Sequence, residues 1–350
     1  MMKEAESEKP EAKRLPAVSR RRVQLLTQQL IKTEYLQPGQ TLPLVIRPAV
    51  PDLDPIAWAL ENRELIKTQV LQHGALLFRD FNLQTPERFR QFIEAAAGEL
   101  IEYRERSSPR SQVGERVYTS TDYPAEQSIF PHNEHSYALT FPLRLFFFCE
   151  TPAAQGGETP LADTRKILAR IDTQIIDRFR EKKWRYVRNF GDGFGLPWQT
   201  VFQTTDRVVV EEYCRRARIE CEWKEGNRLR TWQVREAIAA HPQTGESVWF
   251  NHATFFHVST LERQLREALL SEFDEEDLPN NTYYGDGSPI EPEVLDKLRT
   301  AYRQEMVQFG WQKGDLVMLD NMLTAHARSP FEGERKVLFA MAEPFTRQDI

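Results

Sequence analysis

The sequence predicts a mainly β fold in which helices pack around the outside of one β core. Three observations indicate this class. From residue 116 onward, short apolar or alternating runs are broken by proline and glycine at the spacing of a β-sandwich or barrel. Helical periodicity is found before these runs and between them. A chain of 350 residues with 40% hydrophobic content is also large enough to bury a sizeable core.

The N-terminal part of the chain is predicted to start with a tail and to continue with helices and strands. Residues 1–25 contain no apolar segment typical of a secretory signal, and we expect them to be disordered. Helical periodicity, mixed in character, follows over 23–36. We then expect a strand at 43–50, a helix at 55–74 ending at Gly74, a strand at 75–81, and a helix at 85–98 that opens with Thr85-Pro86 and closes at Gly98.

The rest of the chain is predicted to form the β core with helical inserts. Strand signals lie at 116–124, 143–152, 156–163, 247–256, 314–331 and 335–345. The inserts are expected roughly at 164–183 and 259–310, the latter with helices over 259–273 and 291–310. Ser259-Thr260 and Glu262 are spaced for a capping box. We expect residues 26–350 to form a single domain, with a variable insert at 184–246.

Composition excludes several classes of protein. A net charge of −6 argues against a nucleic-acid-binding protein, which usually has a basic surplus. No apolar stretch approaches the ~18 residues of a membrane span, because Arg144 interrupts even the run at 141–150. The three cysteines include no CxxC pair, which favours reduced thiols and a cytoplasmic location. We therefore expect no nucleic-acid partner and no membrane.

The stretch "PHNEHSY" at 131–137 concentrates groups that could bind a metal. His132 and Glu134 are two residues apart, so on an extended strand their side chains would lie on the same face and converge. This pair alone is weak evidence, since a chain with seven histidines contains about one such pair by chance. An exposed polar pair is an equally acceptable interpretation of these two residues.

A second motif near the C-terminus strengthens the metal interpretation. His326 lies at the end of the apolar strand predicted within 314–331, and the next strand begins with Arg335-Lys336. Two imidazoles and one carboxylate are the components of the triad that binds non-haem Fe(II) and leaves coordination positions open. Arg335 has the donor geometry to bind a carboxylate in the same cavity, although a single arginine more often forms a surface salt bridge.

Together these motifs resemble a known family. The segments "GALLFRDF", "FPHNEHSY", "GGETPLADTRKI", "WFNHATFFH" and "GDLVMLDNMLTAHARSPFEGERKVLFAMAEP" resemble the TauD/TfdA-like Fe(II)/2-oxoglutarate-dependent dioxygenases. The resemblance covers about residues 73–345 and is strongest to the SyrP-like and clavaminate synthase-like branch. It implies a double-stranded β-helix core, that is, a cupin-like jelly roll.

The resemblance also implies roles for individual residues. His132, Glu134 and His326 would be the catalytic metal ligands. Thr159 would lie near the distal carboxylate of 2-oxoglutarate, and Arg335 is the first candidate to bind that carboxylate.

One position departs from the family pattern. The family's further arginine aligns roughly with Ala340, which leaves Arg328 and Lys336 as alternative cations for 2-oxoglutarate.

The implied activity is oxidation of an unactivated C–H bond by Fe(II), 2-oxoglutarate and O₂. The resemblance implies an amino acid or amino-acid-derived substrate, free or tethered to a carrier protein, in specialised-metabolite biosynthesis. Glu134 disfavours halogenation, because the related halogenases carry a small residue at that position. Two alternatives stay open: a non-catalytic jelly-roll scaffold, which Ala340 alone supports, and a zinc hydrolase with the same ligands.

For several other residues a structural role is an alternative to a functional one. We expect His135 to pack beside the ligand set rather than to bind metal. Asn251 either lines the substrate pocket or satisfies nearby backbone groups. The segment Phe146-Phe147-Phe148 is expected in the core. Cys214 and Cys221 lack paired histidines, so we expect no zinc site there.

Overall fold

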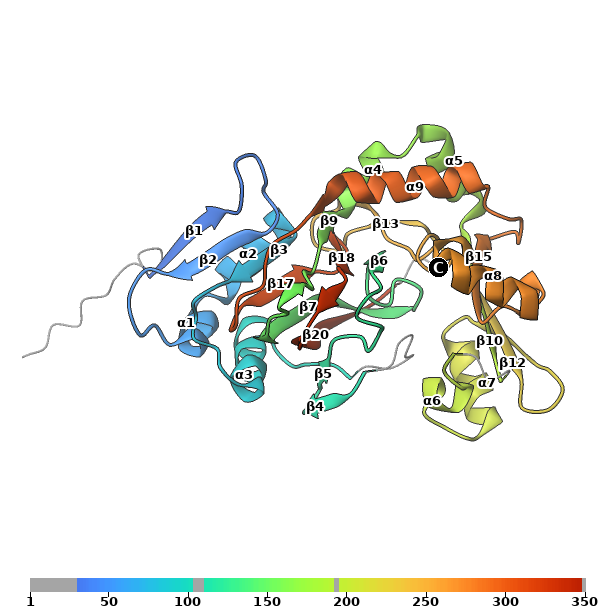
Figure 1. The fold of residues 1–350 in the computed structure, drawn as a ribbon, viewed down its shortest axis with the longest axis horizontal. Coiled ribbons are helices and arrows are strands. Elements are labelled where there is room, and N and C mark those ends of the chain that lie inside the picture. Colours follow the sequence, from blue (N-terminus) through green and yellow to red (C-terminus); the bar gives the residue numbers. More distant parts are fainter. Residues whose placement is uncertain (1–29, 103–109, 192–194, 348–350) are drawn as a thin grey trace, which may run out of the picture.

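The computed structural model describes residues 30–102, 110–191 and 195–347. The predicted disordered tail at 1–25 lies outside these residues. The described chain is mainly β with helices around it, as predicted, and its core is the expected jelly-roll arrangement of two facing sheets (Figure 1). No helix in the described ranges has the length and apolar character needed to span a bilayer.

The larger sheet has eight strands in the order β1-β2-β3-β17-β7-β20-β5-β4. Neighbouring strands are antiparallel except β2 and β3, which are parallel. Its strands are β1 (Ile31–Tyr35), β2 (Leu44–Pro48), β3 (Ala75–Phe78), β4 (Gln112–Gly114), β5 (Val117–Thr119), β7 (Thr140–Thr151), β17 (Leu316–Asp320) and β20 (Lys336–Thr346).

The smaller sheet carries the motifs that predicted a metal site. Its order is β16-β9-β18-β6, formed by β16 (Met306–Val307), β9 (Leu161–Asp163), β18 (Thr324–Arg328) and β6 (Ile129–His132). A short pair, β8 (Gln155–Gly156) and β19 (Phe331–Glu332), lies in the connections beside it.

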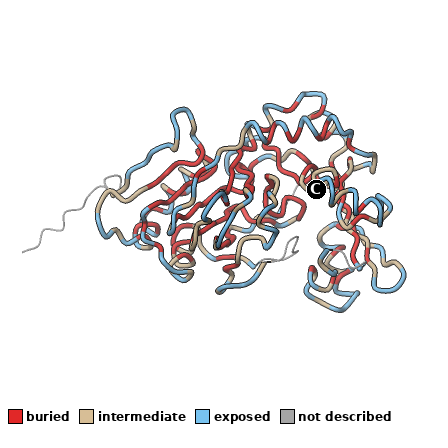
Figure 2. Tube along the Cα trace, in the orientation of Figure 1, coloured by how far each residue is buried: buried red, intermediate tan, exposed pale blue. Residues whose placement is uncertain are grey.

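The central strand β7 is apolar over most of its length because both of its faces are covered. Leu145 and Phe147 face the cluster between the two sheets, whereas Phe146 and Phe148 face the cluster beneath the N-terminal helices. The three phenylalanines are therefore core residues, as predicted. Figure 2 shows the same pattern, with buried segments gathered in the central strands. The covering helices are α1 (Pro55–Glu61), α2 (Arg63–His73) and α3 (Pro86–Ala97).

The capping signals at the N-terminal helices were interpreted correctly. The Thr85 hydroxyl accepts a hydrogen bond from Arg88 N at 3.2 Å, and Pro86 occupies the first turn of α3. Gly98 ends this helix with a φ of 90°, and Gly74 ends α2 with a φ of 79°. The helix predicted at 55–74 is nevertheless two helices, because the Asn62 amide donates to Trp58 O at 2.8 Å and breaks the run.

Three further predictions were wrong in detail. Residues 31–35 form β1 rather than helix, because they pair with β2 at the sheet edge. The insert at 164–183 is two helices, α4 (Thr164–Arg170) and α5 (Thr173–Lys182). The insert at 259–310 contains a strand, β15 (Asn280–Tyr284), between α8 (Arg263–Glu272) and α9 (Pro292–Glu305). Glu262 precedes α8 without a side-chain capping bond, so the capping box is not formed.

Residues 184–246 build most of a separate four-stranded sheet, which we call the insert sheet. Its order is β11-β12-β10-β15, and all of its neighbours are antiparallel. It lies at the end of the molecule opposite α1–α3 (Figure 1). That residues 26–350 form one domain stays a prediction. The helices and strands of residues 184–249 are β10 (Trp184–Phe190), α6 (Trp198–Phe202), α7 (Arg207–Arg216), β11 (Glu220–Trp223), β12 (Leu229–Arg235), and a separate two-stranded pair, β13 (Ile238–Ala240) and β14 (Ser247–Trp249).

Candidate metal centre and cavity

His132 and His326 face each other on neighbouring strands of the smaller sheet. The two residues are direct partners in the antiparallel pairing of β6 with β18, and their ring centroids are 4.4 Å apart. Side chains at directly opposed positions share one face of a sheet. The pairing therefore brings together two imidazoles separated by almost two hundred positions in the sequence.

Glu134 reaches the same point from a turn, not from a strand. Because β6 ends at His132, our prediction that strand alternation orients Glu134 was wrong. The turn is held instead by the buried side chain of Asn321. Its Oδ1 accepts from Glu134 N at 2.8 Å, and its Nδ2 donates to Glu134 O at 2.8 Å and to Pro142 O at 2.9 Å. Asn133 Nδ2 adds a bond to Asn321 O at 2.6 Å.

The three side chains offer ligand atoms that all lie within 4.8 Å of one another, and all three residues are buried. In the described part of the chain this is the one group of three such side chains that could hold a metal ion. His132 Nδ1 lies 2.9 Å from Phe130 O, and since a carbonyl only accepts, Nδ1 carries the proton and Nε2 keeps its lone pair. The donor set fits a divalent transition metal such as Fe(II).

The electrostatics of the pair favour neutral imidazoles. Burial lowers the pKa of His132, and the charge of Arg110 adds to this, although Glu134 opposes it. Burial also lowers the pKa of His326 well below its usual value, with further contributions from His132 and Arg110. Neutral imidazoles are the form that binds metal, so neither histidine has to lose a proton at neutral pH.

Arg110 is the residue of the site that the sequence did not reveal. Its Nη2 lies 3.0 Å from Glu134 Oε2, and its guanidinium sits 3.9 Å from the centroid of the Phe339 ring. Only 3% of the side chain is exposed. The surrounding letters, "SPRSQV", carry no motif, so no pattern distinguishes this arginine from the many others. His135 also lies near the carboxylate, with Nε2 3.7 Å from Glu134 Oε1.

The structure brings Arg335 against the glycine-rich segment that contains Thr159. Arg335 Nε donates to Gly157 O at 2.9 Å and Nη1 donates to Ser120 Oγ at 3.2 Å. Gly157 has a φ of 71°, and a Cβ at this position would lie 2.9 Å from Arg335 Cδ, so only glycine lets the arginine approach. Thr159 is buried, and its hydroxyl accepts from Trp311 Nε1 at 3.2 Å. Burial lowers the pKa of Arg335 to about 10, which still leaves it charged at neutral pH.

The alternative cations have other partners. Arg328 donates from both of its Nη atoms to the carbonyls of Tyr123, Pro124 and Gln127, and so holds that loop. Lys336 pairs with Glu150 at 2.9 Å, and 39% of its side chain is exposed. Arg335 is therefore the better candidate for binding 2-oxoglutarate.

Ala340 does not face the site. It belongs to the cluster beneath α3, on the opposite face of β20 from Phe339. Phe339 lies on the site face, because its ring is 5.3 Å from Phe147, whose ring is 5.0 Å from that of His326. An arginine at position 340 would point away from His326, so this position, with which we roughly aligned the family's further arginine, has no place in the site.

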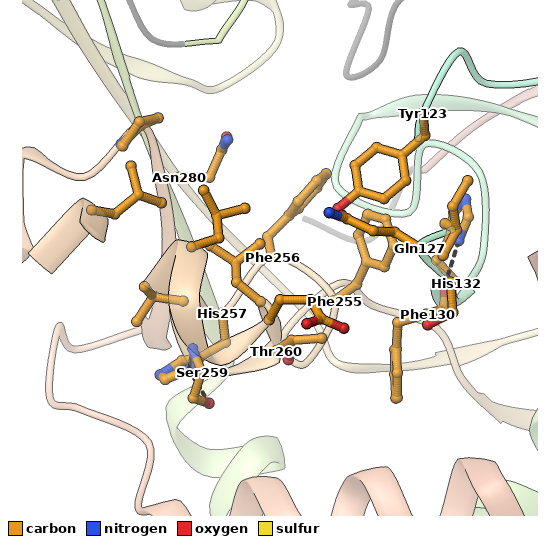
Figure 3. Close-up of a pocket in the computed structure, with 18 of the residues that line it drawn as sticks. Tyr123, Gln127, Phe130, His132, Phe255, Phe256, His257, Ser259, Thr260 and Asn280 are labelled. Carbon is orange, nitrogen blue, oxygen red and sulfur yellow. Dashed lines mark hydrogen bonds between the residues drawn. The ribbon is translucent and has the colours of Figure 1, made fainter. Parts of the chain in front are cut away.

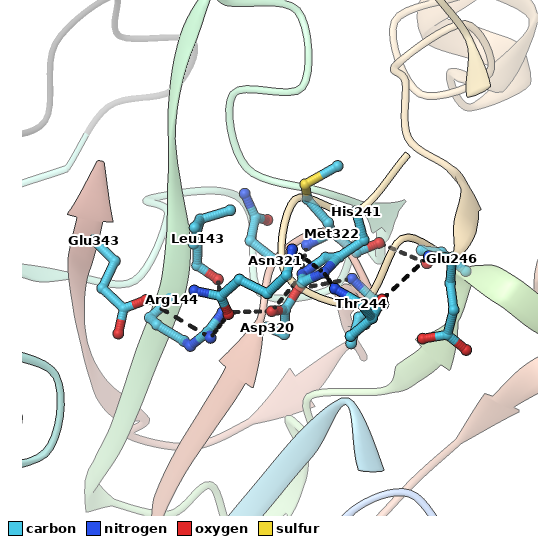
Figure 4. A network of polar contacts seen from close by, with 12 residues as sticks. Leu143, Arg144, His241, Thr244, Glu246, Asp320, Asn321, Met322 and Glu343 are labelled. Carbon is cyan, nitrogen blue, oxygen red and sulfur yellow. Dashed lines mark hydrogen bonds and ion pairs between the residues drawn. The ribbon is translucent and has the colours of Figure 1, made fainter. Parts of the chain in front are cut away.

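A network of polar contacts surrounds Asp320, the residue that precedes Asn321 (Figure 4). Asp320 pairs with Arg144 and lies 3.0 Å from His241 Nε2, and its Oδ1 accepts from the backbone of Met322 and Leu323. Burial alone raises the pKa of Asp320, but Arg144 and His241 outweigh it and hold the pKa below its usual value. The chain that carries Asn321 is thus fixed on both sides.

The turn is also held from the insert sheet. Gln233 Nε2 and Arg235 Nε, both on β12, donate to Tyr137 O at 2.8 and 3.0 Å. Arg235 Nη2 further donates to Ala217 O, at the end of α7, at 2.8 Å. The loop that contains Glu134 is therefore hydrogen-bonded both to Asn321 and to β12 of the insert sheet.

His132 and Glu134 open onto a cavity of about 770 Å³. Tyr123, Gln127 and His132 lie on one side of it, and Ser259 and Asn280 lie on the other (Figure 3). The Phe255 ring stacks on the His132 ring at 4.4 Å between centroids, so an aromatic side chain of the cavity lies directly against a candidate metal ligand.

The remaining polar residues have structural partners. Asn251 donates to Ala237 O at 2.9 Å and accepts from Ala253 N at 3.0 Å, which is the backbone-satisfying alternative. His257 Nδ1 accepts from Ser259 N at 3.1 Å. Among the described residues, neither Cys214 nor Cys221 belongs to a group that could hold a metal.

Comparison with known proteins gives consistent matches. Residues 37–341 match the model of the "Taurine catabolism dioxygenase TauD, TfdA family". The chain is 42% identical to the dapdiamide synthesis protein DdaC of Enterobacter agglomerans over 273 residues, which are 78% of this chain and 83% of that protein. It is 27% identical to a clavaminate synthase-like protein of Arabidopsis thaliana over 282 residues, 78% of this chain and 82% of that protein.

Solved structures share the fold at low identity. The crystal structure of PvcB from Pseudomonas aeruginosa has a TM-score of 0.54 at 16% identity, covering 91% of this chain and 93% of that one. AAD-2 in complex with Mn(II) and N-oxalylglycine has a TM-score of 0.52 at 14% identity, covering 91% and 99%.

Proposed function

This chain belongs to the TauD, TfdA family of dioxygenases, and from that membership we propose that it is an Fe(II)/2-oxoglutarate-dependent oxygenase acting on an unactivated C–H bond. The observation that carries the proposal is the meeting of His132, Glu134 and His326 at a buried point on a large cavity. Bound Fe(II) and 2-oxoglutarate would supply the activation of O₂, coupled to decarboxylation of 2-oxoglutarate to succinate.

The chain's own residues would hold, orient and shield these groups. His132, Glu134 and His326 would hold the metal on one face, which leaves the other positions open. Arg335 would bind the distal carboxylate of 2-oxoglutarate with Thr159 beside it. Phe255, which stacks on His132, would help to exclude water and to hold the substrate C–H bond in place.

We also propose that the substrate is an amino acid or an amino-acid-derived compound of specialised metabolism, free or bound to a carrier protein. The support is the relative named for dapdiamide synthesis, together with PvcB, described as "an Fe, alpha-ketoglutarate dependent oxygenase from an isonitrile synthetic pathway". A cytoplasmic location is proposed on the cysteine content. The scaffold alternative loses its support, because Ala340 does not face the site.

The test combines metal binding with turnover. Under anaerobic conditions, Fe(II) and 2-oxoglutarate together should give the native protein a visible absorption band, and O₂ should then release succinate. Glu134→Ala should weaken Fe(II) binding and abolish succinate release, because it removes the anionic ligand. Glu212→Ala is the matched control, since Glu212 lies on the surface of α7, paired with Arg215 and Arg216. Native-like turnover in Glu134→Ala would exclude the proposed ligand set, and activity without O₂ or 2-oxoglutarate would favour a hydrolase.

A further inference from the structure

His257 lines the cavity on the side away from the candidate metal ligands. In Figure 3, His257 and Ser259 lie across the cavity from His132. The His257 side chain is partly buried, and it does not belong to the group that could hold a metal. None of the roles proposed above involves this side chain.

Backbone contacts determine which nitrogen of His257 carries the proton. Ser259 N donates to Nδ1 at 3.1 Å, so Nδ1 presents its lone pair. Burial, with the charge of Arg299 nearby, lowers the pKa of His257 to about 4, so the ring is neutral at neutral pH. A neutral imidazole with an unprotonated Nδ1 carries its single proton on Nε2.

The Nε2–H group of His257 is a donor that a ligand in the cavity can reach. Among the residues that the structure describes, Nε2 has no hydrogen-bond partner, because both contacts of the ring nitrogens with Ser259 are made by Nδ1. His257 is part of the cavity lining. An N–H donor that loses its water without gaining another acceptor is unfavourable. A ligand that fills the cavity is therefore favoured when it presents an acceptor to this nitrogen.

The ring of His257 is held in place by a network of hydrogen bonds. Ser259 Oγ lies 2.7 Å from Nδ1 and also accepts from Arg299 Nη2. Arg299 donates in turn to Thr260 Oγ1 at 3.1 Å and to Asp296 Oδ1 at 2.8 Å. The positive charge of Arg299 is thus paired with Asp296, so the ligand meets a fixed and uncharged donor at His257.

His257 and the candidate metal ligands contact different parts of one cavity. Phe255, two positions before His257, stacks on the His132 ring. No contact in the described part of the chain joins the His257 side chain to His132, Glu134 or His326. A cavity of about 770 Å³ has the size of sites that enclose a drug-sized ligand, so one ligand can lie against both regions.

We propose that His257 donates a hydrogen bond from Nε2 to an uncharged carbonyl oxygen of the substrate, such as that of an amide, at a point away from the oxidised C–H bond. His257 is thereby a specificity-determining residue. An uncharged acceptor suits a neutral donor, because a carboxylate taken out of water needs a cation beside it. This inference rests on the proposed function, because it takes the cavity as the substrate site. It narrows the amino-acid-derived substrates to those that carry an acylated or amide-linked portion.

The first measurement needs no organic probe in the cavity. NMR of ¹⁵N-histidine-labelled protein, loaded with Zn(II) and N-oxalylglycine to keep the centre diamagnetic, reports which nitrogen of each imidazole is protonated. At pH 7 the signal that disappears in His257→Asn should show a protonated Nε2 and an unprotonated Nδ1. A protonated Nδ1 at His257 would overturn the proposal, because Nε2 would then have no proton to donate.

The second measurement compares oxygen with sulfur as the acceptor. Isothermal titration calorimetry would measure binding of N-acetyl-L-leucinamide and N-acetyl-L-phenylalaninamide, and of their N-thioacetyl analogues, to protein loaded with Mn(II) and N-oxalylglycine. Because sulfur is the weaker acceptor, the native protein should bind at least one acetyl compound about 3- to 10-fold more tightly than its thio analogue, the range for one neutral hydrogen bond.

Three variants assign this preference to His257. His257→Asn can still accept from Ser259 N but has no donor at the position of Nε2, so it should abolish the preference. His257→Gln, whose longer side chain brings an amide nitrogen close to that position, should keep part of it. His73→Asn is the matched control, since His73 is a histidine at the end of α2 outside the cavity lining, and it should leave the preference unchanged.

Two binding results would overturn the proposal. One is that the native protein prefers neither acetyl compound to its thio analogue, including the case in which no probe binds, and this comparison needs no variant to fold. The other is that the preference survives in His257→Asn. Failure of the proposed function is separate, because it would appear as no absorption band and no succinate release in the native protein. An intact band without any preference for oxygen would overturn the role of His257 alone.

Discussion

Replacing Asn321 with alanine should loosen the turn that carries Glu134 while leaving the side chain of every candidate metal ligand unchanged. The substitution removes three side-chain hydrogen bonds, to Glu134 N, Glu134 O and Pro142 O. Asn321 is fully buried, so Glu134 N, Glu134 O and Pro142 O would each lose this hydrogen bond at a position that solvent does not reach. At about 1 kcal/mol for each lost bond, the free energy of unfolding should fall by about 3 kcal/mol.

The displaced carboxylate should weaken metal binding in addition to stability. Side chains that orient a metal ligand typically contribute about 10- to 100-fold in affinity, and we expect a loss in that range. Titration of the metal-free protein with Mn(II) or Co(II) measures it, and thermal denaturation measures the stability loss independently.

Asn281→Ala is the matched control. Asn281 is equally buried and its side chain also makes three bonds, to Val258 N, Glu275 and Tyr283, but it lies in the insert sheet. It should lower stability and leave metal affinity unchanged. Native metal affinity in Asn321→Ala, or an equal loss of affinity in the control, would refute the reasoning.

Two other predictions concern Arg335 and His257. Arg335→Ala should raise KM for 2-oxoglutarate at least about 10-fold with little change in KM for the substrate. The control Lys336→Ala should change neither KM value. An unchanged KM for 2-oxoglutarate in Arg335→Ala, measured by steady-state kinetics, would contradict the assignment. Burial, with Arg299 nearby, lowers the pKa of His257 from 6.5 to about 4. Between these two pH values the unfolded chain therefore binds a proton at His257 that the folded chain does not bind. The free energy of unfolding should fall by about 3 kcal/mol as the pH drops from 6.5 to 4. His257→Asn, which can still accept the Ser259 N–H, should show a smaller loss in chemical denaturation over this interval, and an unchanged slope would exclude His257 as the cause.

Local signals in the sequence predicted local structure well. The Thr85-Pro86 start, the glycines at 74 and 98, and the apolar run within β7 depend on neighbouring residues, and each led to a correct helix end or strand. One exception was decided by a contact between separate segments. Residues 31–35 are a strand because β2 is available to pair with them.

The candidate site was predictable in composition but not in its supporting contacts. His132 and His326 were found by residue type and by resemblance. His326 lay within a predicted strand, but β6, the strand that pairs His132 with it, was not among the predicted strands. Glu134 was included for the wrong geometric reason, since its orientation depends on Asn321. Arg110 and Asn321 act through contacts over long sequence separations, which residue spacing does not reveal.

The carbonyl of Tyr137, three positions after Glu134, is held by two donors from β12. This limits how the enzyme can be re-engineered. A chimera in which residues 184–246 are exchanged for those of a relative must bring its own equivalents of Gln233 and Arg235, or that carbonyl loses both of these hydrogen bonds. Grafting the segment therefore alters the loop that carries Glu134, and a loss of activity in such a graft does not by itself report on substrate preference.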